Sequence, residues 1–206
     1  MKDKILSNLP NEKHTLLEIS YPEIHIVDRK NSDKTKGIVI YDQKQEDIKS
    51  VCLFNNTELE ILVDAFGENA LPIKKGKHAS QCECVVFPSN YDEKSWTLVI
   101  ETKYAADEEA AFKIRENEVN YPKKMVSQII STVEYFREKN IIDKSRVVHA
   151  IISFPNLIAD FNSQLFSFVE KEEWSAEYLL LYKKIRIKGC NAANIISNKR
   201  LRFVTD

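Results

Sequence analysis

Two glutamates and a lysine, Glu83, Glu101 and Lys103, are the residues whose types and spacing are best suited to chemistry. Glu83 lies in the apolar run QCECVVFP, and the other two residues end the run WTLVIETKY. The polar segment SNYDEKS between these runs has a length typical of an antiparallel hairpin. Because side chains alternate along a strand, Glu101 and Lys103 fall on the same face. We therefore expect a two-stranded ribbon that carries an acid on one strand and an acid and an amine on the other.

The register of this hairpin decides whether the two acids meet. If Pro88 pairs with Trp96, then Glu83 pairs with Glu101, and directly opposed β-carbons lie about 4.5–5.5 Å apart. Two carboxylates at that separation repel each other unless a cation lies between them. A hard dication such as Mg²⁺ prefers oxygen ligands, and a neighbouring lysine would orient a water molecule or stabilise charge on a phosphate.

Context singles out this group, because the tripeptide Asp/Glu-x-Lys is common in the chain. It occurs five times, at Asp28–Lys30, Asp42–Lys44, Asp47–Lys49, Asp92–Lys94 and Glu101–Lys103. Only the last of these ends an apolar run that predicts a buried strand.

The pattern of CECVVFP followed by LVIETKY resembles the PD-(D/E)XK nuclease superfamily, whose fold is called restriction-endonuclease-like. The resemblance covers about residues 57–155 and implies an α/β fold with an α-β-β-β-α-β core. It implies that Glu83 stands where most members have aspartate and that Glu101 and Lys103 match the (D/E)xK motif. The implied function is hydrolysis of nucleic-acid phosphodiester bonds, with Mg²⁺ or Mn²⁺ bound by Glu83 and Glu101 and with Lys103 assisting the attacking water. DNA is expected rather than RNA, because most relatives cut DNA.

The resemblance leaves two further positions open. Many members carry another acid on the first helix, for which Glu58 and Asp64 are alternatives here. Some relatives have a Gln-x-x-x-Tyr motif on the helix after the motif strand, and Gln128, followed by Thr132 and Tyr135, is a partial match.

The elements around the motif fit one domain over residues 1–206, in three parts. Residues 1–50 form a β-rich extension with strands at LLEIS, EIHIVDR and GIVIYD; the turn 30–36 separates the last two. The nuclease-like core spans 51–160, and a C-terminal helix and β extension spans 161–206. Within the core we expect a helix from the capping box Thr57–Glu60 to Gly67, strands at 81–88, 96–104 and 146–154, and helices at 105–117 and from Pro122 to Asn140. A helix at 157–171 follows, and the segments 177–189 and 193–204 are expected to be strands or a hairpin.

Composition limits the class of protein. The chain has 206 residues, 43% of them hydrophobic, a formal net charge of -1 and only four glycines. These values predict a globular protein, disfavour binding to nucleic acid through overall charge and nearly exclude glycine-rich phosphate loops. The start lacks an apolar signal-peptide core and no apolar run is long enough to span a membrane, so we expect a cytoplasmic protein without a membrane partner. Its four cysteines are then expected to be thiols. The oligomeric state stays open, and a homo-oligomer is compatible with the sequence.

Two structural interpretations compete with the nuclease hypothesis. Glu83, Glu101 and Lys103 would also form a cross-strand ion pair on a surface strand, worth about 0.2–1 kcal/mol. Alternatively, the same fold would serve as a catalytically inactive module that binds nucleic acid or protein.

Three other groups have simpler explanations beside their functional ones. His78, Cys82 and Cys84 suggest zinc, but their spacing differs from that of common structural sites. His149 suggests a catalytic triad, but its apolar surroundings favour a core histidine. The C-terminal cations would form either a nucleic-acid-facing edge or an edge that discourages aggregation; they are Lys183, Lys184, Arg186, Lys188, Lys199, Arg200 and Arg202.

Overall fold

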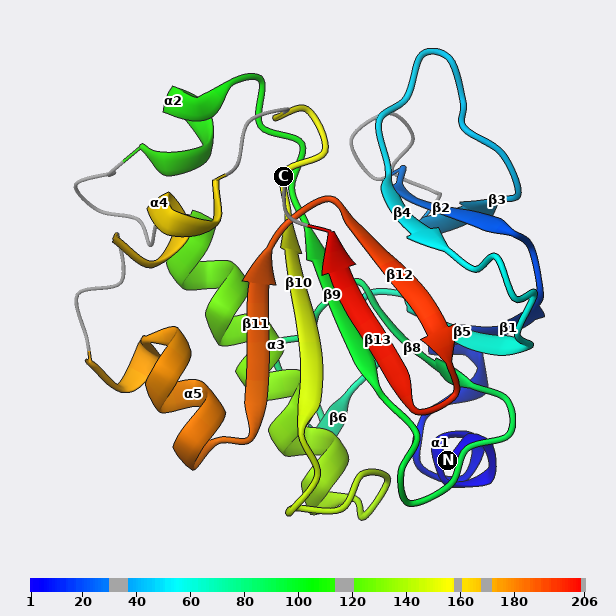
Figure 1. Ribbon diagram of the computed structural model, residues 1–206. Coiled ribbons are helices and arrows are strands. Elements are labelled where there is room, and N and C mark those ends of the chain that lie inside the picture. Colours follow the sequence, from blue (N-terminus) through cyan, green and yellow to red (C-terminus); the bar gives the residue numbers. More distant parts are fainter. Residues whose placement is uncertain (30–36, 114–120, 158–160, 168–171, 205–206) are drawn as a thin grey trace.

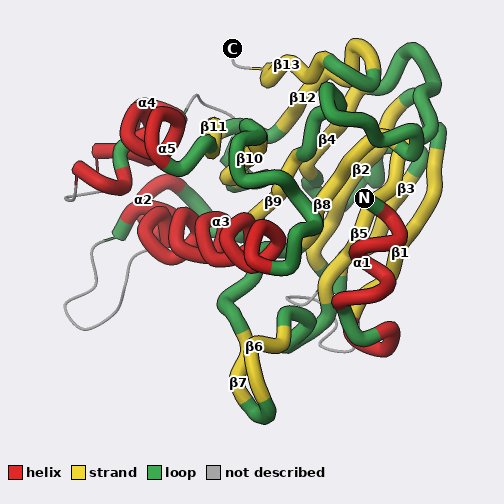
Figure 2. Tube along the Cα trace, turned by 90° about the horizontal axis from the view of Figure 1, so that it is seen from below, coloured by secondary structure: helices red, strands yellow, loops and turns green. Residues whose placement is uncertain are grey.

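The protein is a mixed α/β structure with two main sheets. The computed structural model describes residues 1–29, 37–113, 121–157, 161–167 and 172–204. The expected turn at 30–36, the end of the helix expected at 105–117 and both ends of the helix expected at 157–171 lie at least partly outside these residues. Helices, the larger sheet (sheet A) and the smaller sheet (sheet B) form three successive layers (Figure 1, Figure 2).

Sheet A has six strands and carries the predicted hairpin at its centre. In spatial order they are β1 (His14–Ile19), β5 (Ile61–Phe66), β8 (Cys84–Pro88), β9 (Leu98–Thr102), β10 (Val148–Ser153) and β11 (Ile185–Gly189). The pairs β1–β5, β5–β8 and β8–β9 are antiparallel, whereas β9–β10 and β10–β11 are parallel. A parallel connection needs a long crossover, and the segment between β9 and β10 supplies it.

Sheet B joins strands from the two ends of the chain. In spatial order they are β13 (Arg200–Val204), β12 (Ala192–Ser197), β4 (Val51–Phe54), β2 (Glu23–Asp28) and β3 (Ile38–Tyr41). The hairpin of β12 and β13 crosses in front of β9 and continues the sheet of β4, β2 and β3 (Figure 1). A further small hairpin consists of β6 (Pro72–Lys74) and β7 (Lys77–His78).

The helices lie mostly along one side of sheet A. They are α1 (Lys2–Asn8), α2 (Glu108–Phe112), α3 (Tyr121–Glu138), α4 (Asn162–Ser167) and α5 (Ala176–Tyr182), with 3-10 turns at Asn11–Lys13 and Glu172–Trp174. Helix α3 is the crossover between β9 and β10. As predicted, it has Pro122 in its first turn and buries Met125, Ile129 and Phe136, while Asn140 follows its end with a positive φ of 55°.

Alternation along the strands of sheet A creates two cores. Val85 and Val99 face α3 and α1, whereas Val86 and Leu98 face sheet B. Because both faces are covered, β5, β8 and β9 are buried along their whole length and mostly apolar, as expected of interior strands. A polar side chain on such a strand is therefore placed in the protein interior.

The helix expected at 57–67 is wrong, because this segment forms β5. All six residues of Ile61–Phe66 are buried, which a strand between two cores allows and a one-sided helix does not. The expected cap is also replaced: Glu58 has a φ of 47°, and Glu60 accepts a hydrogen bond from the Ser89 hydroxyl at 2.6 Å.

The terminal segments confirm part of the prediction. Strands at the three N-terminal runs are present, but β1 joins sheet A and only β2 and β3 join sheet B. The hairpin of β12 and β13 is as expected. The segment 177–182 forms most of α5 rather than a strand, with the Ser175 hydroxyl accepting a hydrogen bond from the Tyr178 backbone at its start.

Candidate functional site

The structure brings Glu83, Glu101 and Lys103 together at one end of sheet A. The Lys103 ammonium lies 2.9 Å from Oε1 of Glu101 and 3.3 Å from Oε1 of Glu83. The β8–β9 register pairs Cys84 with Ile100, which confirms the predicted register within the two strands. Glu83 lies just before β8, and its N–H also bonds to Ile100. The three side chains therefore share a place at which one cation faces two carboxylates.

Backbone hydrogen bonds to neighbouring strands hold the residues of the candidate site in place. The Glu83 N–H donates to the Ile100 carbonyl, and the Glu83 carbonyl accepts from the Phe66 N–H, both at 3.0 Å. The Lys103 N–H donates to the Ser153 carbonyl at 3.0 Å. Strands β5, β9 and β10 thus hold the backbone of these residues on both sides of the candidate site.

Helix α3 forms hydrogen bonds with the segment that precedes Glu83. The Gln128 amide donates to the Gln81 carbonyl at 2.7 Å, and the Thr132 hydroxyl accepts from the Cys82 N–H at 2.9 Å. Gln128, singled out by the resemblance, therefore acts on the backbone two residues before Glu83. Tyr135, further along the same helix, is buried in the core.

The ion pair expected under the alternative interpretation is present, but it is buried, so it does not lie on a surface strand. The exposed fraction of the side chain is 0% for Glu101, 5% for Glu83 and 23% for Lys103. Burial lowers the pKa of Lys103, but the nearby charges of Glu101 and Glu83 outweigh it, so the pKa rises above its usual value. With both carboxylates ionised, the three groups carry a formal charge of -1.

Neither candidate for an additional helical acid is on a helix. Glu58 is exposed in a turn. Asp64 lies on β5, pairs in register with Val85, and contacts Nδ1 of His14 at 2.6 Å. Burial raises the pKa of Asp64 to about 6, against the lowering effect of the hydrogen bond to His14. This buried pair shares the sheet face of Glu83.

The zinc interpretation of His78, Cys82 and Cys84 fails. Among the described residues, the only group of three or more potential metal ligands within 4.8 Å of one another is Glu23, His25 and Cys52. Burial raises the pKa of both thiols of the CEC run well above the usual value, because they lie inside the sheet. The sequence did not single out the Glu23 group, although the alternation E-x-H on a predicted strand was a usable signal.

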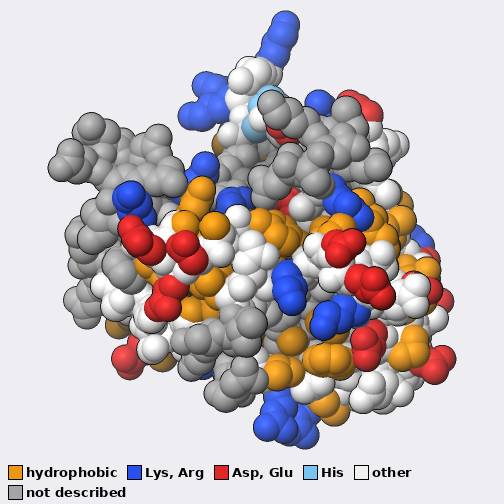
Figure 3. Space-filling model, turned by 90° about the horizontal axis from the view of Figure 1, so that it is seen from above, with side chains coloured by type: hydrophobic (Ala, Val, Ile, Leu, Met, Phe, Trp, Pro, Cys, Tyr) orange, Lys and Arg blue, Asp and Glu red, His pale blue; other side chains and the backbone are white. Residues whose placement is uncertain are grey.

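The C-terminal cations are divided between the two sheets, with Arg186 and Lys188 on β11 of sheet A and Arg200 and Arg202 on β13 of sheet B. Lys183 makes an ion pair with Glu134 at 2.5 Å, and Arg186 lies on β11, opposite His149 in register. His149 is largely buried and contacts the ring of Phe203; burial, and then the charge of Arg186, lowers its pKa to about 4. Figure 3 shows the end of the molecule toward which β9 runs, where Lys and Arg side chains lie among acidic and hydrophobic ones.

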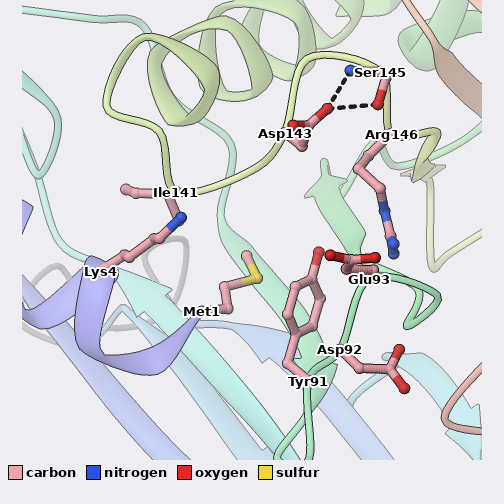
Figure 4. Close-up of a pocket in the computed structure, with 9 residues that line it drawn as sticks. All are labelled: Met1, Lys4, Tyr91, Asp92, Glu93, Ile141, Asp143, Ser145 and Arg146. Atoms are coloured by element: carbon pink, nitrogen blue, oxygen red, sulfur yellow. Dashed lines mark hydrogen bonds between the residues drawn. The ribbon is translucent and has the colours of Figure 1, made fainter.

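A cavity of about 590 Å³ lies at the opposite end of sheet A (Figure 4). Tyr91 and Glu93 line it from the β8–β9 loop, Met1 and Lys4 from the N-terminus, and Arg146 from the segment before β10. The guanidinium of Arg146 lies 5.8 Å from the centre of the Tyr91 ring. This lining mixes acids, bases and apolar groups, and none of the three predicted site residues belongs to it.

No protein-family model, no curated protein and no solved structure matches this chain. Of the helices that the structure describes, none has the length and hydropathy of a membrane span.

Proposed function

We propose that this protein is a cytoplasmic metal-dependent nuclease that hydrolyses phosphodiester bonds, with DNA as its substrate. The observation that carries the proposal is the approach of Glu83 and Glu101, both buried, to the one ammonium of Lys103. An ammonium held by two carboxylates marks a place where the protein favours a cation. We take the ammonium to occupy the position that Mg²⁺ or Mn²⁺ would have when bound.

The order of elements around the candidate site supports the proposal. Strands β5, β8 and β9 form an antiparallel meander, α3 crosses over, and β10 returns parallel to β9. This is the β-β-β-α-β order of the restriction-endonuclease-like core implied by the resemblance. The helix that precedes the meander differs, because β1 to β4 separate α1 from β5.

The donor set fits a magnesium or manganese ion. Mg²⁺ binds oxygen at about 2.0–2.1 Å, takes one or two carboxylates and keeps the rest of its octahedral shell for water and phosphate. Glu83 and Glu101 would supply those carboxylates. A metal in such a site polarises a phosphoryl oxygen and lowers the pKa of bound water.

Lys103 has the role of a positioning and charge-stabilising group in this proposal. Its side chain is the most exposed of the three, at 23%, so it can turn outward without opening the sheet. Turned outward, the ammonium would face the attacking water and the phosphate, where it stabilises negative charge as the bond breaks.

An inactive binding module is the second candidate function. The complete burial of Glu101 favours it, because a metal and a phosphate must reach the carboxylates from the side of Lys103. In this alternative the ion pair only holds β8 and β9 together, and the protein binds nucleic acid or protein without cleaving it.

Cleavage assays on three variants test the proposal. Single-stranded, linear and supercoiled DNA and an RNA of matched sequence are incubated with the protein in Mg²⁺, in Mn²⁺ or in a chelator. We expect metal-dependent cleavage of DNA that Glu101→Gln and Lys103→Ala abolish. Lys94→Ala is the matched control, because Lys94 ends another Asp-x-Lys tripeptide on an exposed loop and its loss should leave cleavage unchanged.

The binding module predicts a different result. The wild-type protein would cleave none of the substrates in either metal, and isothermal titration would detect no Mg²⁺ or Mn²⁺ binding at millimolar concentration. Cleavage that survives in Glu101→Gln would also overturn the proposal, since it would come from another site or a contaminant.

A further inference from the structure

A second group of metal-ligating side chains lies on the outer face of sheet B. Strands β2 and β4 are antiparallel, and His25 pairs directly with Cys52. Glu23 is two residues before His25 and shares its face, because side chains alternate along the strand. The intervening residues, Ile24 and Leu53 among them, point the other way into the core between the sheets. One carboxylate, one imidazole and one thiol are therefore neighbours outside that core.

The distances suit a tetrahedral metal. One ligand atom from each side chain lies within 4.8 Å of the other two, and Nε2 of His25 is 3.2 Å from Oε2 of Glu23. With metal–ligand bonds of about 2.0–2.3 Å, the ligand atoms of a tetrahedral zinc site are separated by roughly 3.3–3.6 Å. The observed contact of 3.2 Å is close to this separation, and the sulfur of Cys52, within 4.8 Å of the other two ligand atoms, would approach them to complete the set.

The histidine is also oriented for ligation. Nδ1 of His25 lies 2.9 Å from the Ser50 hydroxyl, and the His25 side chain is only 5% exposed. When Nδ1 carries the proton and donates it to that hydroxyl, Nε2 presents its lone pair to Glu23 and Cys52. Metal-ligating histidines characteristically bond their other ring nitrogen in this way.

We propose that Glu23, His25 and Cys52 form a zinc site, with a water molecule in the fourth position. The mixture of nitrogen, oxygen and sulfur ligands suits Zn²⁺ and is unsuitable for Mg²⁺, which prefers oxygen. Binding releases the thiol proton to solvent, so the thiolate and the Glu23 carboxylate balance the charge of the ion. The ion would tie β2 to β4 in the middle of sheet B. The proposal is independent of the nuclease proposal, because it rests on other residues and on another sheet.

Metal binding by the purified, metal-stripped protein tests the site. We expect one Zn²⁺ per chain in the presence of excess Mg²⁺, and a cobalt-substituted protein with the intense absorption of a tetrahedral thiolate complex. Cys52→Ala and His25→Ala should abolish this binding. Ser50→Ala keeps all three ligands and should weaken it by about 10–100-fold, as expected when a supporting hydrogen bond to a ligand is lost. The matched control His78→Ala removes an exposed histidine of β7 and should leave binding unchanged.

If a variant does not fold, X-ray absorption spectroscopy of the zinc-loaded wild-type protein identifies the ligand atoms instead. The expected shell has one sulfur and three nitrogen or oxygen neighbours. A shell without sulfur, a wild-type protein that takes up no zinc at micromolar concentration, or undiminished binding by a folded Cys52→Ala variant would each overturn the proposal.

Discussion

Replacing Lys103 by methionine tests whether the two opposed carboxylates require a cation. Methionine keeps much of the volume of the lysine stem but leaves Glu83 and Glu101 facing each other without an ammonium between them. At an effective dielectric constant of about 20, each of the contacts at 2.9 and 3.3 Å corresponds to about 5–6 kcal/mol of Coulomb attraction. Desolvation offsets most of this sum, and breaking a buried pair by removing one partner costs about 3–5 kcal/mol in practice.

We therefore expect Lys103→Met to lower the free energy of unfolding by about 3 kcal/mol at pH 8, since Lys103 is partly exposed and the loss falls at the low end of that range. Urea unfolding at constant ionic strength measures it.

A divalent cation should replace the missing ammonium. With Mg²⁺ or Mn²⁺ at about 100 times its dissociation constant, binding to the folded state alone restores about 2.7 kcal/mol. The metal should therefore stabilise Lys103→Met more than the wild-type protein, whose own ammonium competes for the same place. Lys94→Met serves as the control. If Lys103→Met is as stable as wild type within about 0.5 kcal/mol, or if Mg²⁺ stabilises both proteins equally, the carboxylates do not form a cation site and the electrostatic reasoning is wrong.

Three further predictions concern the surroundings of the candidate site. Thr132→Val leaves the N–H of Cys82 buried without its acceptor, so urea unfolding should show a loss of about 1–3 kcal/mol, whereas no loss would mean that water or a shift of α3 replaces the hydroxyl. The pKa of Asp64, about 6 against a usual 3.8, corresponds to about 3 kcal/mol of stability that is present below pH 4 and lost as the pH rises through 6. The free energy of unfolding of Asp64→Asn should lack this dependence on pH, and an equal pH dependence in both proteins would contradict the assignment. The ring of His149 should titrate near pH 4 by NMR, and Arg186→Gln should raise its pKa; a midpoint near 6.5 would show that the ring is not desolvated.

Local alternation made the central hairpin predictable. The runs ending at Pro88 and starting at Trp96 have a fixed length, so one loop determined the register, and the structure confirms it from Cys84 to Val86. The burial of the site could not be predicted from the sequence, because it depends on sheet B and α3 covering opposite faces of the same strands.

The errors arose where tertiary packing overrides local pattern. Leu59, Leu62, Val63 and Phe66 match helical spacing, yet β5 is buried on both faces and its alternate residues serve two different cores. The group of Glu23, His25 and Cys52 depends on the pairing of β2 with β4, which no single run of residues specifies.

The strands of sheet B come from distant parts of the sequence, and this constrains how the chain folds. Strand β4 pairs with β12, about 140 residues later in the sequence, and β13 then extends the same sheet. During synthesis, one edge of β4 therefore stays unpaired until residues 192–204 have been made. Contacts of such long sequence separation slow folding and leave an unpaired edge available to other chains. Fusions or truncations that remove the last hairpin should accordingly aggregate, even though they leave every residue of the acidic pair and its lysine in place.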